Sequence, residues 1–350
     1  MAKGRPGRVP WPDVQRHTVI ALGIGLAAIV AGVVYAGAGA VAQAIVSLRI
    51  SGLLVLVLLH VPIVVMMGFA WGLASGSDSP VPQSRLVWAR FVRDAAGELL
   101  PFLQVGGIVF GLRALGRGRA IAVGAVSAGI DGVMELAAKL PYVVAALLTL
   151  LALTSQPRLV RLLFLALAVT GVLVAILLLA RHPLSASLQA MAKAVAARWP
   201  ALLSPDEGAE AFDIQACFRH IMGQRARLWL AFTLHLCCWF LGAGELWVTF
   251  RLLGVDLTLW QALAIDGSVA ALRTFGWMVP AAAGVQEASY LLAAAVFGIS
   301  PAAAIAASLA RRARDLVLGV GVLGIATLGD AGFAPQTLSM VKLRQRPRER

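Results

Sequence analysis

The chain has 350 residues, of which 60% are hydrophobic and only 13% are charged. This composition excludes an ordinary soluble globular protein and is typical of helices that span a membrane. The formal net charge of +13 comes mostly from Lys and Arg in the tails and at the ends of apolar runs, which favours the positive-inside pattern over nucleic-acid binding.

The first half of the chain predicts a basic cytoplasmic tail over 1–18, followed by spanning helices. These helices are expected at 19–41, 52–74, 120–139, 141–156 and 159–180. Residues 85–98 predict an interfacial amphipathic helix with its basic residues toward lipid headgroups. Residues 99–115 are too short and too rich in glycine for one crossing, so we expect a re-entrant segment. The residues expected to break it are Pro101, Gly106 and Gly107.

The second half begins with a polar loop expected over 181–226, which is too short for a core of its own. Further spanning helices are expected at 227–251, 258–278 and 302–328, which brings the predicted number to eight. Pro280 and Gly284 predict a second broken segment over 279–299. The tail at 331–350 is basic and therefore expected in the cytoplasm. The sequence thus predicts one all-α, polytopic membrane domain over 19–330.

Seven charged residues in or beside these apolar runs are candidates for binding a ligand, because a charge at the bilayer centre costs about 3 kcal/mol or more. They are Asp131, Glu135, Arg273, Glu287, Arg311, Arg314 and Asp315. Arginine suits a phosphate because its planar fork binds two oxygens at once.

Each candidate also has a purely structural interpretation. Asp131 and Glu135 share a helical face and could be satisfied by a neighbouring helix. Arg311 and Asp315 could pair along one helix, and Glu287 suits the positive end of a helix dipole. Asp266 and Arg273, two turns apart on one face, are expected to be partners through water or a third group.

The order of parts around the two broken segments predicts an internal repeat. Residues 52–139 and 258–328 each run from a spanning helix through a Pro-Gly break to a short helix, a turn and a charged helix. Such paired, interrupted segments indicate a transporter-type inverted repeat. The charged helix is acidic in the first unit and basic in the second, so we expect Asp131 and Arg314 to face each other.

Several stretches of the second unit resemble the flippase-like superfamily typified by the transmembrane region of lysylphosphatidylglycerol synthase. They are Val279-Pro-Ala-Ala-Ala-Gly-Val-Gln-Glu-Ala-Ser-Tyr, Phe297-Gly-Ile and Leu309-Ala-Arg-Arg-Ala-Arg-Asp-Leu. Leu100-Pro and Gly106-Gly107 carry the likeness in the first unit. In the second unit, the Gly-Val-Gln-Glu and Arg-Ala-Arg-Asp motifs are most similar to the hopanoid-biosynthesis-associated branch. The chain departs from the family pattern at Ala282, where a glycine is usual, and at Ile108, where an acidic residue is usual.

The resemblance implies a bacterial inner-membrane protein linked to lipid translocation, and the basic tails predict that both termini lie in the cytoplasm. From the broken and charged helices we expect it to translocate a hopanoid, isoprenoid or phospholipid and to bind the headgroup in an intramembrane groove. A membrane-embedded lipid-modifying enzyme and a non-transporting accessory protein of lipid biosynthesis are the alternatives. The sequence has no HExxH, P-loop or GxSxG motif, so we expect no catalytic residue, no metal and no cofactor. The expected partners are a membrane lipid and lipid-biosynthesis enzymes, with no nucleic acid.

Overall fold

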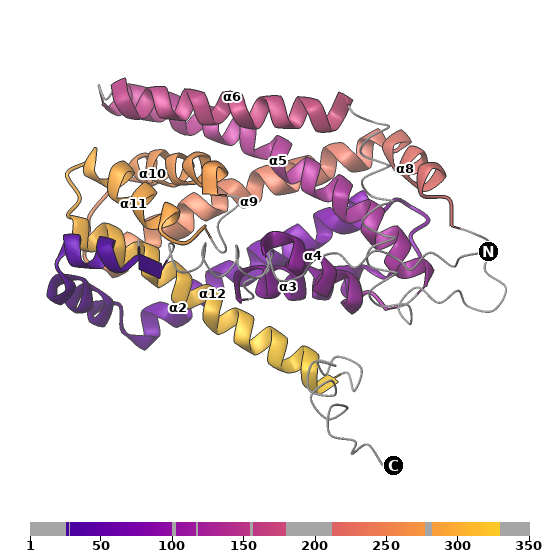
Figure 1. The fold of residues 1–350 in the computed structure, drawn as a ribbon, viewed down its shortest axis with the longest axis horizontal. Coiled ribbons are helices and arrows are strands. Elements are labelled where there is room, and N and C mark those ends of the chain that lie inside the picture. Colours follow the sequence, from indigo (N-terminus) through magenta and orange to yellow (C-terminus); the bar gives the residue numbers. More distant parts are fainter. Residues whose placement is uncertain are drawn as a thin grey trace, which may run out of the picture.

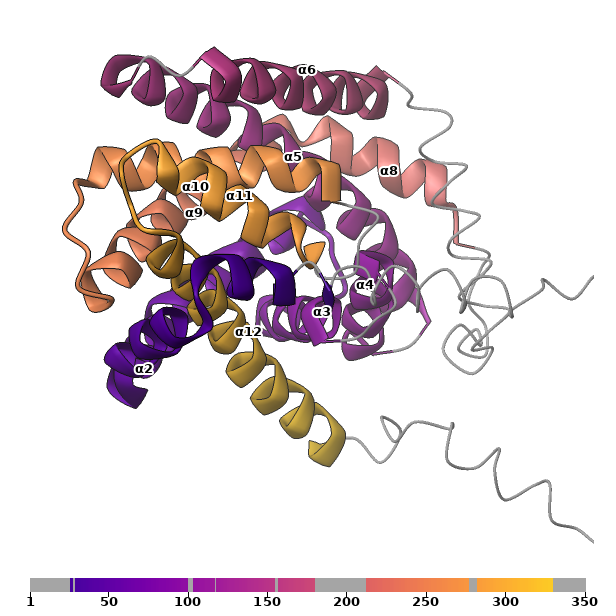
Figure 2. The same cartoon turned by 60° about the vertical axis from the view of Figure 1, so that its left-hand side comes forward.

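The computed structural model describes residues 26–27, 29–99, 103–116, 118–154, 157–179, 212–276 and 282–329. These residues form helices joined by turns, and no strand occurs among them, so the expected all-helical class is confirmed. Figures 1 and 2 show the helices as one bundle, with α6 along one edge. The two predicted tails lie outside the described residues, and so do the predicted break residues Pro101 and Pro280.

The first long helix, α2 (Ala38–Ala74), confirms the spanning segment expected at 52–74 and begins earlier. Residues 26–27 and 29–36 are also helical, and Gly37, with a φ of 85°, separates them from α2. The prediction of one uninterrupted helix over 19–41 is therefore wrong at Gly37, where glycine adopts a positive φ at little cost. Arg49, with a φ of 53°, introduces a kink inside α2 itself.

Helices α3 (Gln83–Leu99) and α4 (Leu103–Ala114) lie against each other. α3 confirms the helix expected at 85–98. Gly106 and Gly107 lie inside α4, so the prediction that they break the chain is wrong. Gly107 instead permits close packing, because a Cβ at this position would lie 2.5 Å from the carbonyl oxygen of Arg93 in α3.

Helix α5 (Arg119–Leu153) is one continuous helix of 35 residues, which would reach about 50 Å. The prediction of separate helices at 120–139 and 141–156 is therefore wrong. Pro141 removes one backbone donor, but its neighbours Ala138 and Tyr142 are fully buried, and this packing holds the helix together. α6 (Pro157–Leu179) follows α5 and confirms the helix expected at 159–180.

Helix α8 (Ile214–Gly223) occupies the described part of the predicted polar loop. Its Phe218 and Ile221 are buried in a cluster with Val126 and Ile130 of α5, so this part is a packed helix and not a surface loop. α9 (Arg225–Leu252) confirms the helix expected at 227–251 and contacts α2, α5, α10 and α12.

The last part of the fold has a short helix between two longer ones. α10 (Leu259–Leu272) ends in a 3-10 turn, η2 (Arg273–Gly276), so the α-helix expected over 258–278 is shorter than predicted. Gly284, with a φ of 77°, directly precedes α11 (Val285–Ala295), as expected for a break. α12 (Pro301–Gly329) confirms the final helix, and its last turns extend away from the bundle in both views.

Three helices within the described ranges, α2, α5 and α9, are long and apolar enough to cross a membrane. α6 adds a shorter apolar stretch, Val160–Ile176. Large apolar side chains on the outside of the bundle are exposed, for example Leu58 at 68% and Leu148 at 61%, as a lipid-facing surface requires. α12 has 29 residues but carries four charged residues near its middle. The number of eight crossings and the inverted repeat stay predictions.

Candidate functional site

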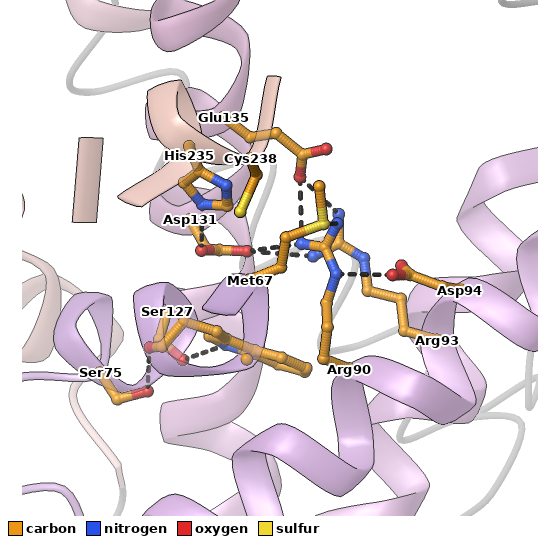
Figure 3. Close-up of polar contacts among 12 residues, drawn as sticks. Met67, Ser75, Arg90, Arg93, Asp94, Ser127, Asp131, Glu135, His235 and Cys238 are labelled. Atoms are coloured by element: carbon orange, nitrogen blue, oxygen red, sulfur yellow. Dashed lines mark hydrogen bonds and ion pairs between the residues drawn. The ribbon is translucent and has the colours of Figure 1, made fainter. Parts of the chain in front are cut away.

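A cluster of six polar side chains lies where α3, α5 and α9 meet, and we call it the shared network. Arg90 is its central member and is bonded to three carboxylates, as Figure 3 shows. Its Nε donates to Asp94 at 2.9 Å, and its Nη1 donates to Asp131 at 3.2 Å and to Glu135 at 3.0 Å. The other two members are Arg93 and His235.

Asp131 is the most enclosed member of the shared network, with a fully buried side chain. Besides Arg90, it accepts a hydrogen bond of 3.3 Å from Arg93 Nη1, and its second oxygen lies 2.8 Å from His235 Nε2. A buried carboxylate is tolerated only when it is paired and hydrogen-bonded in this way. Asp131 is therefore satisfied by neighbouring helices, which agrees with its structural interpretation.

The shared network forms because two helices each present their charges on one face. Arg90, Arg93 and Asp94 are three and four residues apart on α3, and Asp131 and Glu135 are four apart on α5. The prediction that the basic residues of 85–98 point toward headgroups is wrong for Arg90, which is only 3% exposed. The network gives Arg90 partners that compensate for its removal from water.

Asp131, Glu135 and His235 also place potential metal ligands within 4.8 Å of one another. Their carboxylate oxygens, however, already accept hydrogen bonds from Arg90 and Arg93. Two guanidinium charges at this position oppose a divalent cation. The arrangement is therefore better suited to holding helices together than to binding a metal.

Three arginines of α12 form a second set of contacts, which we call the α12 pairs. They are Arg311–Asp266, Arg312–Glu287 and Arg314–Glu245. The carboxylates come from α10, α11 and α9, and all three are nearly buried. One helix is thus tied to three others through separate charge pairs.

Arg311 has the most extensive contacts of the α12 pairs. Its Nη1 donates to Asp266 Oδ1 at 2.6 Å and to the Tyr290 hydroxyl at 3.0 Å, and its Nη2 donates to the Gly242 carbonyl at 2.6 Å. The Tyr142 hydroxyl donates to the other oxygen of Asp266 at 2.5 Å. The expected pairing of Arg311 with Asp315 is not present, and Asp266 is bonded directly to Arg311.

Arg314 donates from Nη1 to Glu245 and from Nη2 to the neighbouring Asp315 at 2.7 Å. The other oxygen of Glu245 lies 2.9 Å from His60 Nδ1, so this carboxylate joins α2, α9 and α12. Asp315 is thus held by Arg314 and not by Arg311.

Glu287 accepts hydrogen bonds from Arg312 Nε at 2.7 Å and from the Ser308 hydroxyl at 3.0 Å. It also accepts one from the Gly284 backbone N–H at 2.8 Å, and it therefore caps α11. This agrees with the expected place of a carboxylate at the start of a helix. The contacts with α12 add a tertiary role that the sequence did not indicate.

Arg273 differs from the other candidate arginines, because its described carboxylate partner, Glu98, lies 3.8 Å away and both side chains are 35% exposed. The separation exceeds a hydrogen bond. Lys139 lies close by and donates a hydrogen bond of 2.7 Å to Thr274, the residue after Arg273. Unlike the arginines of the shared network and of the α12 pairs, Lys139 and Arg273 have no hydrogen bond to a carboxylate among the described residues.

Sequence reasoning placed Asp131 opposite Arg314, but each has other partners. Asp131 is held by α3 and α9, and Arg314 by Glu245 and Asp315. α12 packs mainly on α2 and α3. The predicted pairing of the two charged helices is therefore wrong.

Several residues of these networks were not among the sequence-based candidates, and five of them illustrate what the sequence could and could not indicate. They are Arg90, Arg93, Lys139, Tyr142 and His235. For Arg90 and Arg93 the sequence does contain a signal. Two arginines share one helix face with a single acidic residue, Asp94, which predicts a further carboxylate from another helix. Lys139, four residues after Glu135 within an apolar run, carried a similar signal.

The all-helical fold, the lipid-suited exterior and the buried ion pairs define a multi-pass membrane protein with a charged interior. The model of the family described as "Lysylphosphatidylglycerol synthase TM region" matches residues 19–322. The chain belongs to this family. Searches of curated proteins and of solved structures find no match.

Proposed function

We propose that this protein moves a lipid between the leaflets of the membrane and binds its headgroup among charged side chains near α3, α5, η2 and α12. The observation that carries the proposal is a group of charged side chains that are neither buried nor fully exposed. The exposed fractions are 35% for Glu98, 35% for Arg273, 33% for Asp94, 25% for Asp315 and 24% for Glu135.

These side chains come from helices that pack together. α3 contacts α12, and Leu99 of α3 lies against Gly319 of α12, one turn beyond Asp315. Glu98, the residue before Leu99, lies 3.8 Å from Arg273. Polar groups at such places in a membrane protein commonly line the path of a polar substrate. A lipid headgroup is the polar substrate that family membership favours.

An inverted repeat with eight crossings is part of the same proposal. α4 has 12 residues and α11 has 11, and a turn joins each to a long charged helix, α5 or α12. Short helices at corresponding positions of two halves are the usual surroundings of a transporter's binding site. The basic tails favour an inner-membrane protein with both termini in the cytoplasm.

The proposed lipid is a hopanoid, an isoprenoid or a phospholipid, and lipid-biosynthesis enzymes are the proposed partners. We favour translocation over catalysis because both carboxylate oxygens of Asp131 are already held, one by two arginines and the other by His235. A general base needs a free lone pair within reach of its substrate. Asp131 also has no exposed side-chain surface.

The test is lipid movement in liposomes reconstituted with the purified full chain. Fluorescent phospholipid, isoprenoid and hopanoid analogues would be followed by chemical quenching of the outer leaflet. We expect faster movement than in protein-free liposomes for at least one lipid, and slower movement with Glu98→Gln. Arg158→Gln, an exposed change at the start of α6, is the matched control and should retain the wild-type rate.

Equal rates with and without protein for every lipid class would refute the translocation proposal. Mass spectrometry of the same lipids serves as the second readout. A new lipid product formed by the wild type but not by Asp131→Asn would favour an enzyme instead.

A further inference from the structure

We infer that Lys139 and Arg273, together with the hydroxyl group of Thr274, bind the phosphate group of a lipid headgroup where α5 meets η2. This inference rests on the proposed function, because it specifies the headgroup chemistry that the function would require. It begins with a buried lysine that has no carboxylate partner among the described residues.

Lys139 lies inside the 35-residue helix α5 and is only 8% exposed. Its ammonium group has three N–H donors, one of which reaches the Thr274 hydroxyl at 2.7 Å. Within the described part of the chain, no carboxylate oxygen lies within 4.0 Å of Lys139. Glu135, one turn earlier, accepts its hydrogen bond from Arg90 instead. A buried ammonium normally requires an anionic partner.

The side chain of Trp239 from α9 lies beside this ammonium group. Lys139 Nζ is 5.8 Å from the Trp239 ring centroid, and the same indole stacks on Tyr142 at 5.5 Å. Trp239 Nε1 donates to the Glu135 carbonyl at 3.3 Å, which fixes the ring. An aromatic face stabilises a cation without neutralising its charge. The positive charge of Lys139 is thus held in place and left available.

Arg273 adds a second cation at the same place. Thr274, its neighbour in sequence, is bonded to Lys139, so the two cations belong to one small region, where like charges repel each other. Glu98 at 3.8 Å is too far to satisfy the guanidinium by a hydrogen bond. An anion between the two cations would remove their repulsion.

A phosphate group matches these donors better than a carboxylate does. The guanidinium fork of Arg273 can bind two phosphate oxygens, and Lys139 has two remaining N–H donors for another. The Thr274 hydroxyl accepts from Lys139, so its own hydrogen can be donated to the ligand. The surrounding helices are apolar, which favours a phosphate that carries acyl or isoprenoid chains.

Native mass spectrometry of the detergent-solubilised full chain tests the site. The probes are phosphatidic acid and a diacylglycerol with the same acyl chains, which differ only in the phosphate. We expect the wild type to retain phosphatidic acid preferentially. Lys139→Gln and Arg273→Gln should each weaken this retention about tenfold, as expected for losing one charge-assisted hydrogen bond. Arg158→Gln on the exposed start of α6 is the control and should change nothing.

Three outcomes would overturn the inference. The first is equal retention of both lipids by the wild type, and the second is unchanged phosphatidic acid retention in Arg273→Gln. The third is complete displacement by an equal concentration of inorganic phosphate, which would identify a free-phosphate site instead. Because Lys139 is buried, the melting temperature of Lys139→Gln must be measured, whereas Arg273 is 35% exposed and its variant should fold normally.

The result separates this site from the proposed function. If the wild type binds phosphatidic acid through these residues but moves no lipid, translocation fails and the site stands. If lipid moves normally in Lys139→Gln and Arg273→Gln, and binding is unchanged, the site fails and translocation stands.

Discussion

The shared network and the α12 pairs both hold charges inside a membrane protein, but they do so in different ways. In the shared network, Arg90 and Arg93 are divided among three carboxylates, and Asp131 alone has three partners. In the α12 pairs, each arginine holds one carboxylate from a different helix. The first arrangement is redundant in its arginines, whereas each carboxylate of the α12 pairs has one arginine partner and otherwise only neutral donors or a histidine.

This difference determines how much stability a single substitution should remove in each region. The shared network stabilises the contacts of α3, α5 and α9 with several bonds, so that losing one member leaves the others. The α12 pairs attach a single helix to α9, α10 and α11, and each loss leaves a nearly buried carboxylate with fewer donors. We therefore expect point changes in α12 to have the larger effects.

The largest effect is expected for Arg311→Met. Asp266 has a side chain 7% exposed and, among the described residues, would keep only the Tyr142 hydroxyl as a donor. The cost should be about 3–5 kcal/mol of unfolding free energy. The measurement is the unfolding transition in detergent, followed by tryptophan fluorescence. Arg251→Met is the control, because its pair with Asp256 is exposed and should be worth at most about 1 kcal/mol.

A smaller effect is expected for Arg93→Met in the shared network. Asp131 would keep Arg90 and His235 as partners, so the expected cost is about 1–3 kcal/mol, less than for Arg311→Met in the same assay. Equal or greater destabilisation by Arg93→Met would contradict the redundancy on which the comparison depends.

Double-mutant cycles compare the two regions directly. Asp131→Asn and Arg314→Gln should be additive within about 0.5 kcal/mol, because these residues have separate partners. Asp266→Asn and Arg311→Gln should differ from additivity by about 0.5–3 kcal/mol, because they form one pair. A coupling free energy between Asp131 and Arg314 would instead support the contact that the sequence predicts between these two residues.

Much of the fold could be predicted from the sequence, because long apolar runs leave few alternatives to helices. The helix ends at Gly284 and the spans of α6, α9 and α12 follow from composition and glycine. Pro141 was misinterpreted because a proline ends a helix only where packing does not hold it. Gly107 was misinterpreted because a glycine that permits close packing has the same sequence signature as one that breaks a helix.

The candidate site was harder to predict than the fold. The sequence identified Asp131, Glu287 and Arg311 as charges that need partners, and the structure provides such partners. It could not identify those partners, because ion pairing between helices depends on how the helices pack. Arg90 illustrates this, since its amphipathic helix has the pattern of a membrane-surface helix and yet its guanidinium is buried.

The smallest effect is expected at Ala282, near the start of α11, where its φ is 47°. The turn before α5 places glycines, Gly116 and Gly118, at its positive-φ positions. An alanine with a positive φ costs about 1 kcal/mol relative to a glycine with the same backbone conformation. Ala282→Gly should therefore raise the free energy of unfolding by about that amount. Ala283→Gly is the matched control: Ala283 has no positive φ, so its replacement should leave stability unchanged or lower it slightly. If both changes had the same effect on stability, the turn before α11 would carry no more backbone strain than the turn before α5.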